Sequence, residues 1–253
     1  AAPCLIALDT ATEVVHLALC EGGRVHAQAV GGGAQASVST LPALNAALAQ
    51  AGLAWSDVQA IAFGRGPGAF TGLRTSCAIA QGLALALGIP VLALDTLLAV
   101  AEAARQDHPG IEQALRQDSE ARLWVLQDAR MSEVYAASFR WVDGRWQADQ
   151  APVLWPLAHL RERVASGQLR LVAGSALSAY PDDVACLAEQ GASLAPDARP
   201  HGRALAALAQ AAWAAGEALD AALALPLYVR DKVAQTTAER MADRQQAPGA
   251  AVA

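Results

Sequence analysis

LIALDTATEVVHLAL at residues 5–19 and LWVLQDARMSEVYAASF at residues 123–139 are two versions of one pattern. Each begins with an apolar run that ends in an aspartate, Asp9 or Asp128, and continues through a polar turn into a second apolar run. A glycine-containing turn and a third run follow in both places, which predicts three strands joined by tight turns. The shared order favours an internal duplication over chance similarity.

The patterns that follow each copy also agree. After the first copy, residues 41–48 have helical spacing, residues 58–63 form a short apolar run, and a glycine-rich loop leads into a helix expected over residues 70–87. After the second copy, residues 169–173 resemble the fourth strand and residues 201–217 supply a late helix. We therefore predict an α/β protein with a duplicated actin-like fold (the ASKHA, ribonuclease H-like class), made of two lobes of β-β-β-α-β-α type.

The domain organisation follows from changes in composition along the chain. Residues 107–122 are dense in charge and weak in apolar periodicity, which indicates a lobe boundary. We assign residues 1–106 to an N-terminal lobe that carries the glycine-rich loop and the partner-docking helices, and residues 107–234 to a C-terminal lobe. Residues 235–253 contain few large apolar side chains and are expected to form a mobile tail.

Composition excludes several classes of protein. The formal net charge is −6, so we expect the chain to reach RNA only through a partner. Its four cysteines are scattered without a Cys-x-x-Cys pair, which argues against a zinc ribbon or a disulfide scaffold. The chain does not open with an export signal, and the uncharged stretch 75–94 is broken by glycine, glutamine and proline. We therefore expect a cytoplasmic protein without a membrane span.

GRGPGAFTGLR at residues 64–74 lies between a predicted buried strand and a predicted helix. Backbone N–H groups at such a junction can hold an anion, although the lysine of a Walker-type phosphate loop is absent. We predict a vestigial phosphate or nucleotide site made by Asp9, Thr10, Gly64, Gly66, Gly68, Thr71, Gly72 and Asp128. The alternatives are a tight strand-to-helix connection for the loop and turn chemistry for the aspartates, with Arg130 or Glu133 pairing with Asp128.

Two stretches of the N-terminal lobe contain no charged residue. Neither the residues between Arg24 and Asp57 nor those between Arg74 and Asp95 include Asp, Glu, Lys or Arg. Because a helix on a sheet normally has a charged outer face, these helices are predicted to be covered by a partner. We predict a docking face made by Leu41, Leu44, Leu48, Ser76, Ile79, Ala80 and Leu83. The spacing leaves open which apolar side of the helix 70–87 faces the sheet.

Catalytic and metal-binding motifs are absent from the sequence. The five histidines show neither His-x-x-x-His nor His-Glu-x-x-His spacing, so no helical metal pair is predicted. The Gly-x-Ser-x-Gly motif of hydrolases does not occur either. The sequence therefore predicts no catalytic residues and no metal ligands.

Five segments together resemble the bacterial TsaB (YeaZ) family. They are LIALDTATE at 5–13, IAFGRGPGAFTGLR at 61–74, AQGLA at 80–84, DARMSEVY at 128–135 and PLYVRDKVA at 226–234. The glycine-rich loop and the DARMSEVY run are the most specific of these segments. The resemblance extends from residue 5 to about residue 234.

The resemblance implies a non-catalytic dimerisation and activating subunit of the tRNA N6-adenosine threonylcarbamoyltransferase complex. It implies a catalytic partner, TsaD, and an ATPase, TsaE, which together form threonylcarbamoyladenosine (t6A) at tRNA position 37. ATP, ADP and metal then belong to the partner subunits, and this chain requires no cofactor. It would form a homodimer when alone and would meet tRNA only within the complex.

Two further points limit what the resemblance implies. Ala36 stands where many relatives have a histidine, which disfavours a residual metal role. A peptidase label in this family is inherited from related sequences, so peptidase activity is not expected.

The alternative function is a free-standing actin-like ATPase or phosphotransferase that uses Asp9, the glycine-rich loop and Asp128. The missing lysine and histidine ligands favour the binding subunit.

Overall fold

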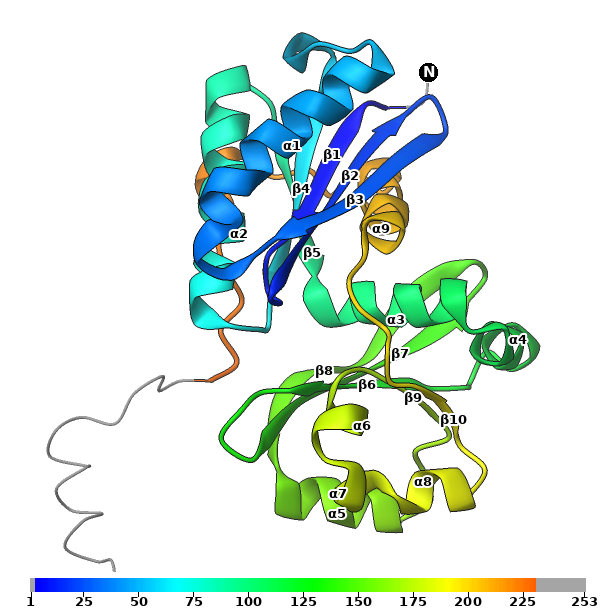
Figure 1. Ribbon diagram of the computed structural model, residues 1–253. Coiled ribbons are helices and arrows are strands. Elements are labelled where there is room, and N and C mark those ends of the chain that lie inside the picture. The colour runs from blue at the N-terminus through cyan, green and yellow to red at the C-terminus, as the bar shows by residue number, and fades with distance from the viewer. Residues whose placement is uncertain (1–2, 231–253) are drawn as a thin grey trace, which may run out of the picture.

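The computed structural model describes residues 3–230, and Figure 1 shows two lobes, each built on a five-stranded sheet. The strand order is β3-β2-β1-β4-β5 in the first sheet and β10-β9-β6-β7-β8 in the second. In both sheets the first three strands pair antiparallel, and the last two run parallel to the first. This repeated mixed topology is the duplicated actin-like fold that the sequence predicts.

The elements of the first half are as follows. Its strands are β1 (Leu5–Asp9), β2 (Val14–Glu21), β3 (Arg24–Gly31), β4 (Ala60–Gly66) and β5 (Val91–Asp95). Its helices are α1 (Ala36–Ala51), α2 (Phe70–Leu87), α3 (Thr96–Asp107) and α4 (Pro109–Gln117), with short 3-10 turns at Gly33–Gln35 and Trp55–Asp57.

The second half repeats the order of the strands and has three helices of four residues each between its last two strands. Its strands are β6 (Leu123–Asp128), β7 (Glu133–Val142), β8 (Arg145–Pro156), β9 (Leu171–Ala173) and β10 (Ser193–Ala195). Its helices are α5 (Leu157–Ala165), α6 (Ala176–Ala179), α7 (Pro181–Val184), α8 (Cys186–Glu189) and α9 (Gly202–Ala214), followed by a 3-10 turn, η3, at Ala221–Leu223.

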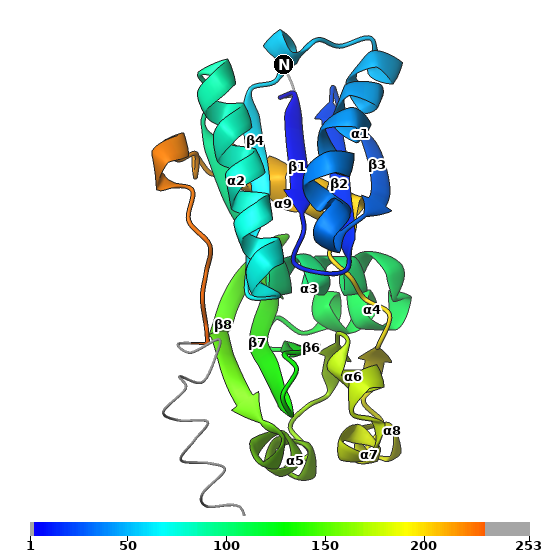
Figure 2. The same ribbon diagram turned by 60° about the vertical axis from the view of Figure 1, so that its left-hand side comes forward.

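Helices cover both faces of the first sheet. Ile6 and Leu8 of β1 face the core formed with α1 and α2, whereas Leu5 and Ala7 face the core formed with α9. Figure 2 shows α1 and α2 in front of the sheet and α9 behind it. A strand that is buried on both faces needs apolar side chains at every position. This is why polar and apolar residues do not alternate in the segment LIAL.

One helix of each half, α3 or α9, packs on the sheet of the other half. Helix α3 follows β5, yet it contributes Leu97 and Val100 to the core of the second sheet, whereas α9 follows β10 and covers β1, β2 and β3. A boundary at residue 107 therefore does not separate two packing units. The sequence could not indicate this exchange, because an amphipathic pattern shows an apolar face but not which sheet that face meets.

The charged segment 107–122 also differs from the loose boundary that its composition suggests. Most of it forms α4, which buries Ile111 and Leu115 against the second sheet. Only these two large apolar residues, four positions apart, mark its inner face, and Pro109 starts the helix at its first turn. The tail expected at residues 235–253 lies outside the described residues.

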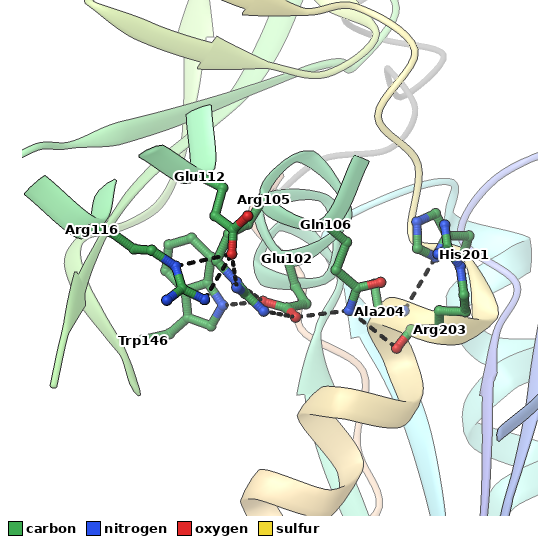
Figure 3. A network of polar contacts seen from close by, with 9 residues as sticks. All are labelled: Glu102, Arg105, Gln106, Glu112, Arg116, Trp146, His201, Arg203 and Ala204. Carbon is green, nitrogen blue, oxygen red and sulfur yellow. Dashed lines mark hydrogen bonds and ion pairs between the residues drawn. The ribbon is translucent and has the colours of Figure 1, made fainter. Parts of the chain in front are cut away.

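A buried carboxylate joins elements of both lobes (Figure 3). Glu102 of α3 accepts hydrogen bonds from the side chains of Arg105, Gln106 and Trp146 at 2.8 to 2.9 Å. Gln106 also donates to the carbonyl of Arg203 in α9 at 3.4 Å. A buried charge is tolerated only when it is paired and hydrogen-bonded. The network therefore holds α3, β8 and α9 in a defined arrangement.

Candidate functional site

Asp9, at the end of β1, is fully buried and bonded through both carboxylate oxygens. Oδ1 accepts a hydrogen bond from the N–H of Ala11 at 2.8 Å, and Oδ2 accepts one from the Thr96 hydroxyl at 2.8 Å. Thr96 in turn accepts a hydrogen bond from the N–H of Gly66 at 3.1 Å, so it connects β1 to the glycine-rich loop. Burial raises the pKa of Asp9 from 3.8 to about 6, because removal from water disfavours the charged form.

The glycine-rich loop packs directly against Asp9 and the turn that follows it. A Cβ added at Gly64 would lie 1.8 Å from Oδ2 of Asp9, and one added at Gly72 would lie 2.1 Å from the carbonyl oxygen of Thr10. The Thr10 hydroxyl also donates a hydrogen bond to the carbonyl of Gly72. These glycines are therefore needed for the close approach of two parts of the same chain.

The other loop residues belong to the same contact or to its rim. Gly66 has a positive φ of 107°, and a Cβ added at Gly68 would lie 2.8 Å from Cβ of Ala11. Thr71 is exposed in the first turn of α2, where its carbonyl accepts a hydrogen bond from the Thr75 hydroxyl. The first-lobe members of the predicted phosphate site are thus gathered in one place. The glycines let the loop backbone pack against Asp9 and the turn that follows it.

Asp128 ends the first strand of the second sheet and is held by side chains. Its Oδ1 accepts hydrogen bonds from the N–H of Arg130 at 2.9 Å and the hydroxyl of Tyr180 at 2.8 Å, and Oδ2 lies 3.3 Å from Nη1 of Arg130. Burial, followed by the bond to Asp128, raises the pKa of Tyr180 to about 12. Of the two residues expected to pair with Asp128, Arg130 does so, whereas Glu133 pairs with Arg230. No sequence pattern pointed to Tyr180, which lies 52 residues from its partner.

The predicted docking residues divide into a buried and a surface group. Four are buried inside the first lobe: Leu44, Leu48, Ser76 and Ala80. Their assignment to a docking face is wrong, because a buried side chain cannot meet a partner while the lobe stays folded. Three reach the surface: Leu41, Ile79 and Leu83. The apolar spacing of α2 predicts two tracks, and only the structure shows that the one containing Ala80 meets the sheet.

The outer side of α1 and α2 carries large apolar side chains. Val38 is 68% exposed, Leu41 43% and Leu85 62%. A hollow of about 430 Å³ lies beside them, lined by Ser37, Phe70, Thr71, Arg74, Thr75, Ala78 and Ile79. Apolar side chains gathered on one face indicate an interaction surface. We call this surface, including the hollow, the α1–α2 face.

The sequence patterns missed the role of residues 224–230. This segment leaves η3 and runs to the second lobe, with the N–H of Leu227 bonded to the carbonyl of Arg65 at 2.7 Å. Its last residue, Arg230, pairs with Glu133 at 2.5 Å. The one available signal was the PLYVR segment, which the family resemblance includes without assigning it a function.

Residues 3–230 contain neither a metal-binding cluster nor a membrane-spanning helix. Within this range no three His, Cys, Asp or Glu side chains lie close enough together to hold a metal ion. No helix of the same range is long and apolar enough to cross a membrane. Ala36, which stands where many relatives have a histidine, is buried at the start of α1.

Curated proteins resemble this chain along most of its length. A family model described as TsaD, tRNA N6-adenosine threonylcarbamoyltransferase, matches residues 33–163. The tRNA threonylcarbamoyladenosine biosynthesis protein TsaB of Escherichia coli K12 is 33% identical over 236 residues, which cover 91% of this chain and 96% of that protein. TsaB of Haemophilus influenzae is 40% identical over 134 residues, which cover 52% of this chain and 51% of that protein.

Solved structures show the same likeness. YeaZ from Pseudomonas aeruginosa is 34% identical, with a TM-score of 0.72 over 89% of this chain and 99% of YeaZ. A second Pseudomonas aeruginosa protein, described as similar to peptidase YeaZ, is 34% identical, with a TM-score of 0.75 over 90% of this chain and 100% of that protein. Both structural alignments include the two lobes of this chain.

Proposed function

The chain belongs to the TsaB family of tRNA threonylcarbamoyladenosine biosynthesis proteins, and from this premise we propose that it is the non-catalytic, activating subunit of a tRNA N6-adenosine threonylcarbamoyltransferase complex. It acts in t6A formation at tRNA position 37 by binding a TsaD-type catalytic subunit, which works with a TsaE-type ATPase. The observation that supports this proposal is the fully buried Asp9, whose two carboxylate oxygens both accept hydrogen bonds from protein donors beneath the glycine-rich loop.

The burial of Asp9 supports the division of roles between the subunits in the proposed complex. Group transfer to adenine N6 needs preorganised groups that stabilise charge in the transition state. Asp9 already has hydrogen-bond donors on both oxygens, and the glycine-rich loop packs on the turn that follows it. In the proposed complex the catalytic groups, the metal and the ATP or ADP therefore belong to the partners. With its formal charge of −6, this chain reaches tRNA only through them, in the cytoplasm.

The α1–α2 face is the proposed docking surface for the TsaD-type subunit. Its exposed apolar side chains, among them Val38 and Leu85, support this assignment. A TsaD family model matches this chain, so the catalytic subunit is expected to present a related pair of helices. Related faces can pair about a pseudo-twofold axis, and in the absence of the partner two copies of this chain can pair through the same face.

A reconstituted reaction tests the proposal. Unmodified tRNA, threonylcarbamoyl-adenylate, a TsaD-type subunit and a TsaE-type ATPase are combined with and without this chain, and t6A is measured by nucleoside mass spectrometry. We expect t6A only when the chain is present, and neither t6A nor ATP turnover from the chain alone. Steady ATP hydrolysis by the pure chain that disappears in Asp9→Asn would instead support the alternative, a free-standing ATPase or phosphotransferase.

The docking surface has its own test with a matched control. Val38→Glu places a carboxylate on the exposed α1–α2 face, and Ala158→Glu places one at an exposed position of α5 in the second lobe. Both variants are expected to melt at the wild-type temperature, because both side chains are solvated. Only Val38→Glu should lose binding to the catalytic subunit, because docking would bury its charge. Equal binding by both variants would place the docking surface elsewhere.

A further inference from the structure

Residues 224–230, which we call the strap, follow η3 and run from a position beside α2 to the second lobe. At the start of the strap, the carbonyl of Ala224 accepts a hydrogen bond from Sγ of Cys77 at 2.9 Å. In the middle, the N–H of Leu227 donates to the carbonyl of Arg65, which lies between Gly64 and Gly66 of the loop. Figures 1 and 2 show the strap in orange, beside α2 above and at the level of the second sheet below. One short segment thus touches both lobes.

The middle of the strap adds an aromatic ring to the α1–α2 face. Tyr228 is 45% exposed, and its ring centroid lies 5.3 Å from that of Phe70. Nε of Arg74 donates to the Tyr228 hydroxyl at 3.1 Å, while its guanidinium lies 3.9 Å from the Phe70 ring centroid. Phe70 and Arg74 both line the hollow of this face. Aromatic rings and arginines in such clusters are the usual anchors of protein interfaces.

The end of the strap is fastened to the turn after β6. Arg230 donates through Nη2 to the carbonyl of Ala129 at 3.0 Å and through Nη1 to Sδ of Met131 at 2.9 Å. The same guanidinium forms an ion pair with Glu133 at 2.5 Å, and its side chain is only 15% exposed. Charge-assisted bonds of this kind are stronger than neutral ones. Arg230 therefore fixes the chain two residues after Tyr228.

We infer that Tyr228 is part of the surface that binds the catalytic subunit, and that Arg230 is a positioning residue that keeps Tyr228 on that surface. The inference rests on the proposed function of the α1–α2 face. Without its anchor, the strap occupies the docked conformation for only a fraction of the time. The apparent affinity for the partner falls in proportion to that fraction. The turn after β6 in the second lobe thereby controls a docking surface in the first.

Two strap variants and one matched control test this inference. Arg230→Met removes the guanidinium, and Tyr228→Ala removes the ring. The control, Arg140→Met, removes another shielded arginine of the second lobe, which is 25% exposed and pairs with Glu120 at 3.0 Å. Binding to the purified TsaD-type subunit is measured by calorimetry. Amide exchange at Leu227 is measured by hydrogen–deuterium exchange without the partner.

Both strap variants are expected to bind about tenfold more weakly than wild type, and Arg230→Met should also exchange the Leu227 amide faster. Arg140→Met should change neither quantity. Unchanged exchange in Arg230→Met overturns the anchor, and faster exchange with unchanged affinity overturns the docking role of the strap. An equal loss of affinity in Arg140→Met overturns the positioning role. If wild type does not bind the catalytic subunit, the proposed function and the docking role of Tyr228 fail together, whereas Leu227 exchange still decides whether Arg230 anchors the strap.

Discussion

The turns after β1 and β6 begin from one sequence pattern and end in different environments. Asp9 is sealed beneath the glycine-rich loop, whereas Asp128 stays partly exposed and is held by Tyr180 and Arg130. The second turn also holds three consecutive residues, 130–132, at positive φ of 53° to 61°, a conformation that side chains other than glycine rarely adopt. The two turns thus share a sequence pattern but not a backbone conformation, and the packing around each turn decides how its aspartate is used.

The two lobes also differ in the elements that follow β4 and β9, the fourth strand of each lobe. In the first lobe the glycine-rich loop leads into one long helix, α2, whose outer side is the proposed docking surface. In the second lobe Gly174 also approaches its neighbouring strand closely, with an added Cβ 2.5 Å from the carbonyl oxygen of Leu126. The helices that follow it there, α6, α7 and α8, have four residues each. The first lobe offers a surface, and the second offers an anchor for the strap.

The largest effect on stability is expected where the glycine-rich loop packs against Asp9. Gly64→Ala places a methyl group 1.8 Å from the Asp9 carboxylate, which cannot move without losing buried hydrogen bonds. We expect a loss of about 3 kcal/mol in the free energy of unfolding, measured with urea. The control, Gly82→Ala, adds a methyl in open space within α2 and should stabilise by about 0.5 to 1 kcal/mol. Wild-type stability of Gly64→Ala would mean that the site is open enough for a ligand.

The buried carboxylate also predicts how stability depends on pH. The pKa of Asp9 is about 6 in the folded chain and 3.8 ordinarily, so the folded chain keeps a proton that the unfolded chain releases. The stability from this group is complete below pH 3.8 and is lost as the pH rises through 6. The loss is on the order of 3 kcal/mol. The variant Asp9→Asn lacks this titration, so the difference in unfolding free energy between wild type and Asp9→Asn should fall by this amount between pH 4 and pH 7. Parallel curves would contradict the burial of Asp9.

Removal of the hydroxyl group that donates to each aspartate compares the two carboxylates directly. Thr96→Val deprives the fully buried Asp9 of a donor and should cost about 2 to 3 kcal/mol. Tyr180→Phe deprives Asp128 of a donor but leaves Arg130 beside it, and should cost about 1 kcal/mol. Urea unfolding of both variants measures the difference. Equal costs would show that the two carboxylates are equally dependent on their partners.

The smallest effect is expected where the two turns meet. Nη2 of Arg130 lies 3.3 Å from Oε1 of Glu13, and both side chains are largely exposed. Exposed ion pairs contribute little because water and salt screen them. Glu13→Gln should therefore change the free energy of unfolding by less than about 0.5 kcal/mol. A larger loss that vanishes at high salt would show that this pair helps to hold the lobes together.

Predictions from the sequence succeeded where the relevant residues are close together in the chain. The helix expected over residues 70–87 coincides with α2, because its start after the glycine-rich loop and its end at Gly88 are local signals. The identity of the docking residues was less predictable. Ala80 and Leu83 are both apolar residues of α2, yet Ala80 is fully buried and Leu83 reaches the surface.

By itself the sequence determined the order of strands and helices as far as α2, the two aspartate turns and the family resemblance, since these depend on residue types at short spacing. Only the tertiary structure decided that α3 and α9 contribute to the core of the other half's sheet, that Gly64 packs against the Asp9 side chain, and that the strap joins the lobes. Each of these features is a contact between residues far apart in the chain. A residue's preference for burial or hydrogen bonding specifies that it needs a partner, and the packing of the whole chain selects which one.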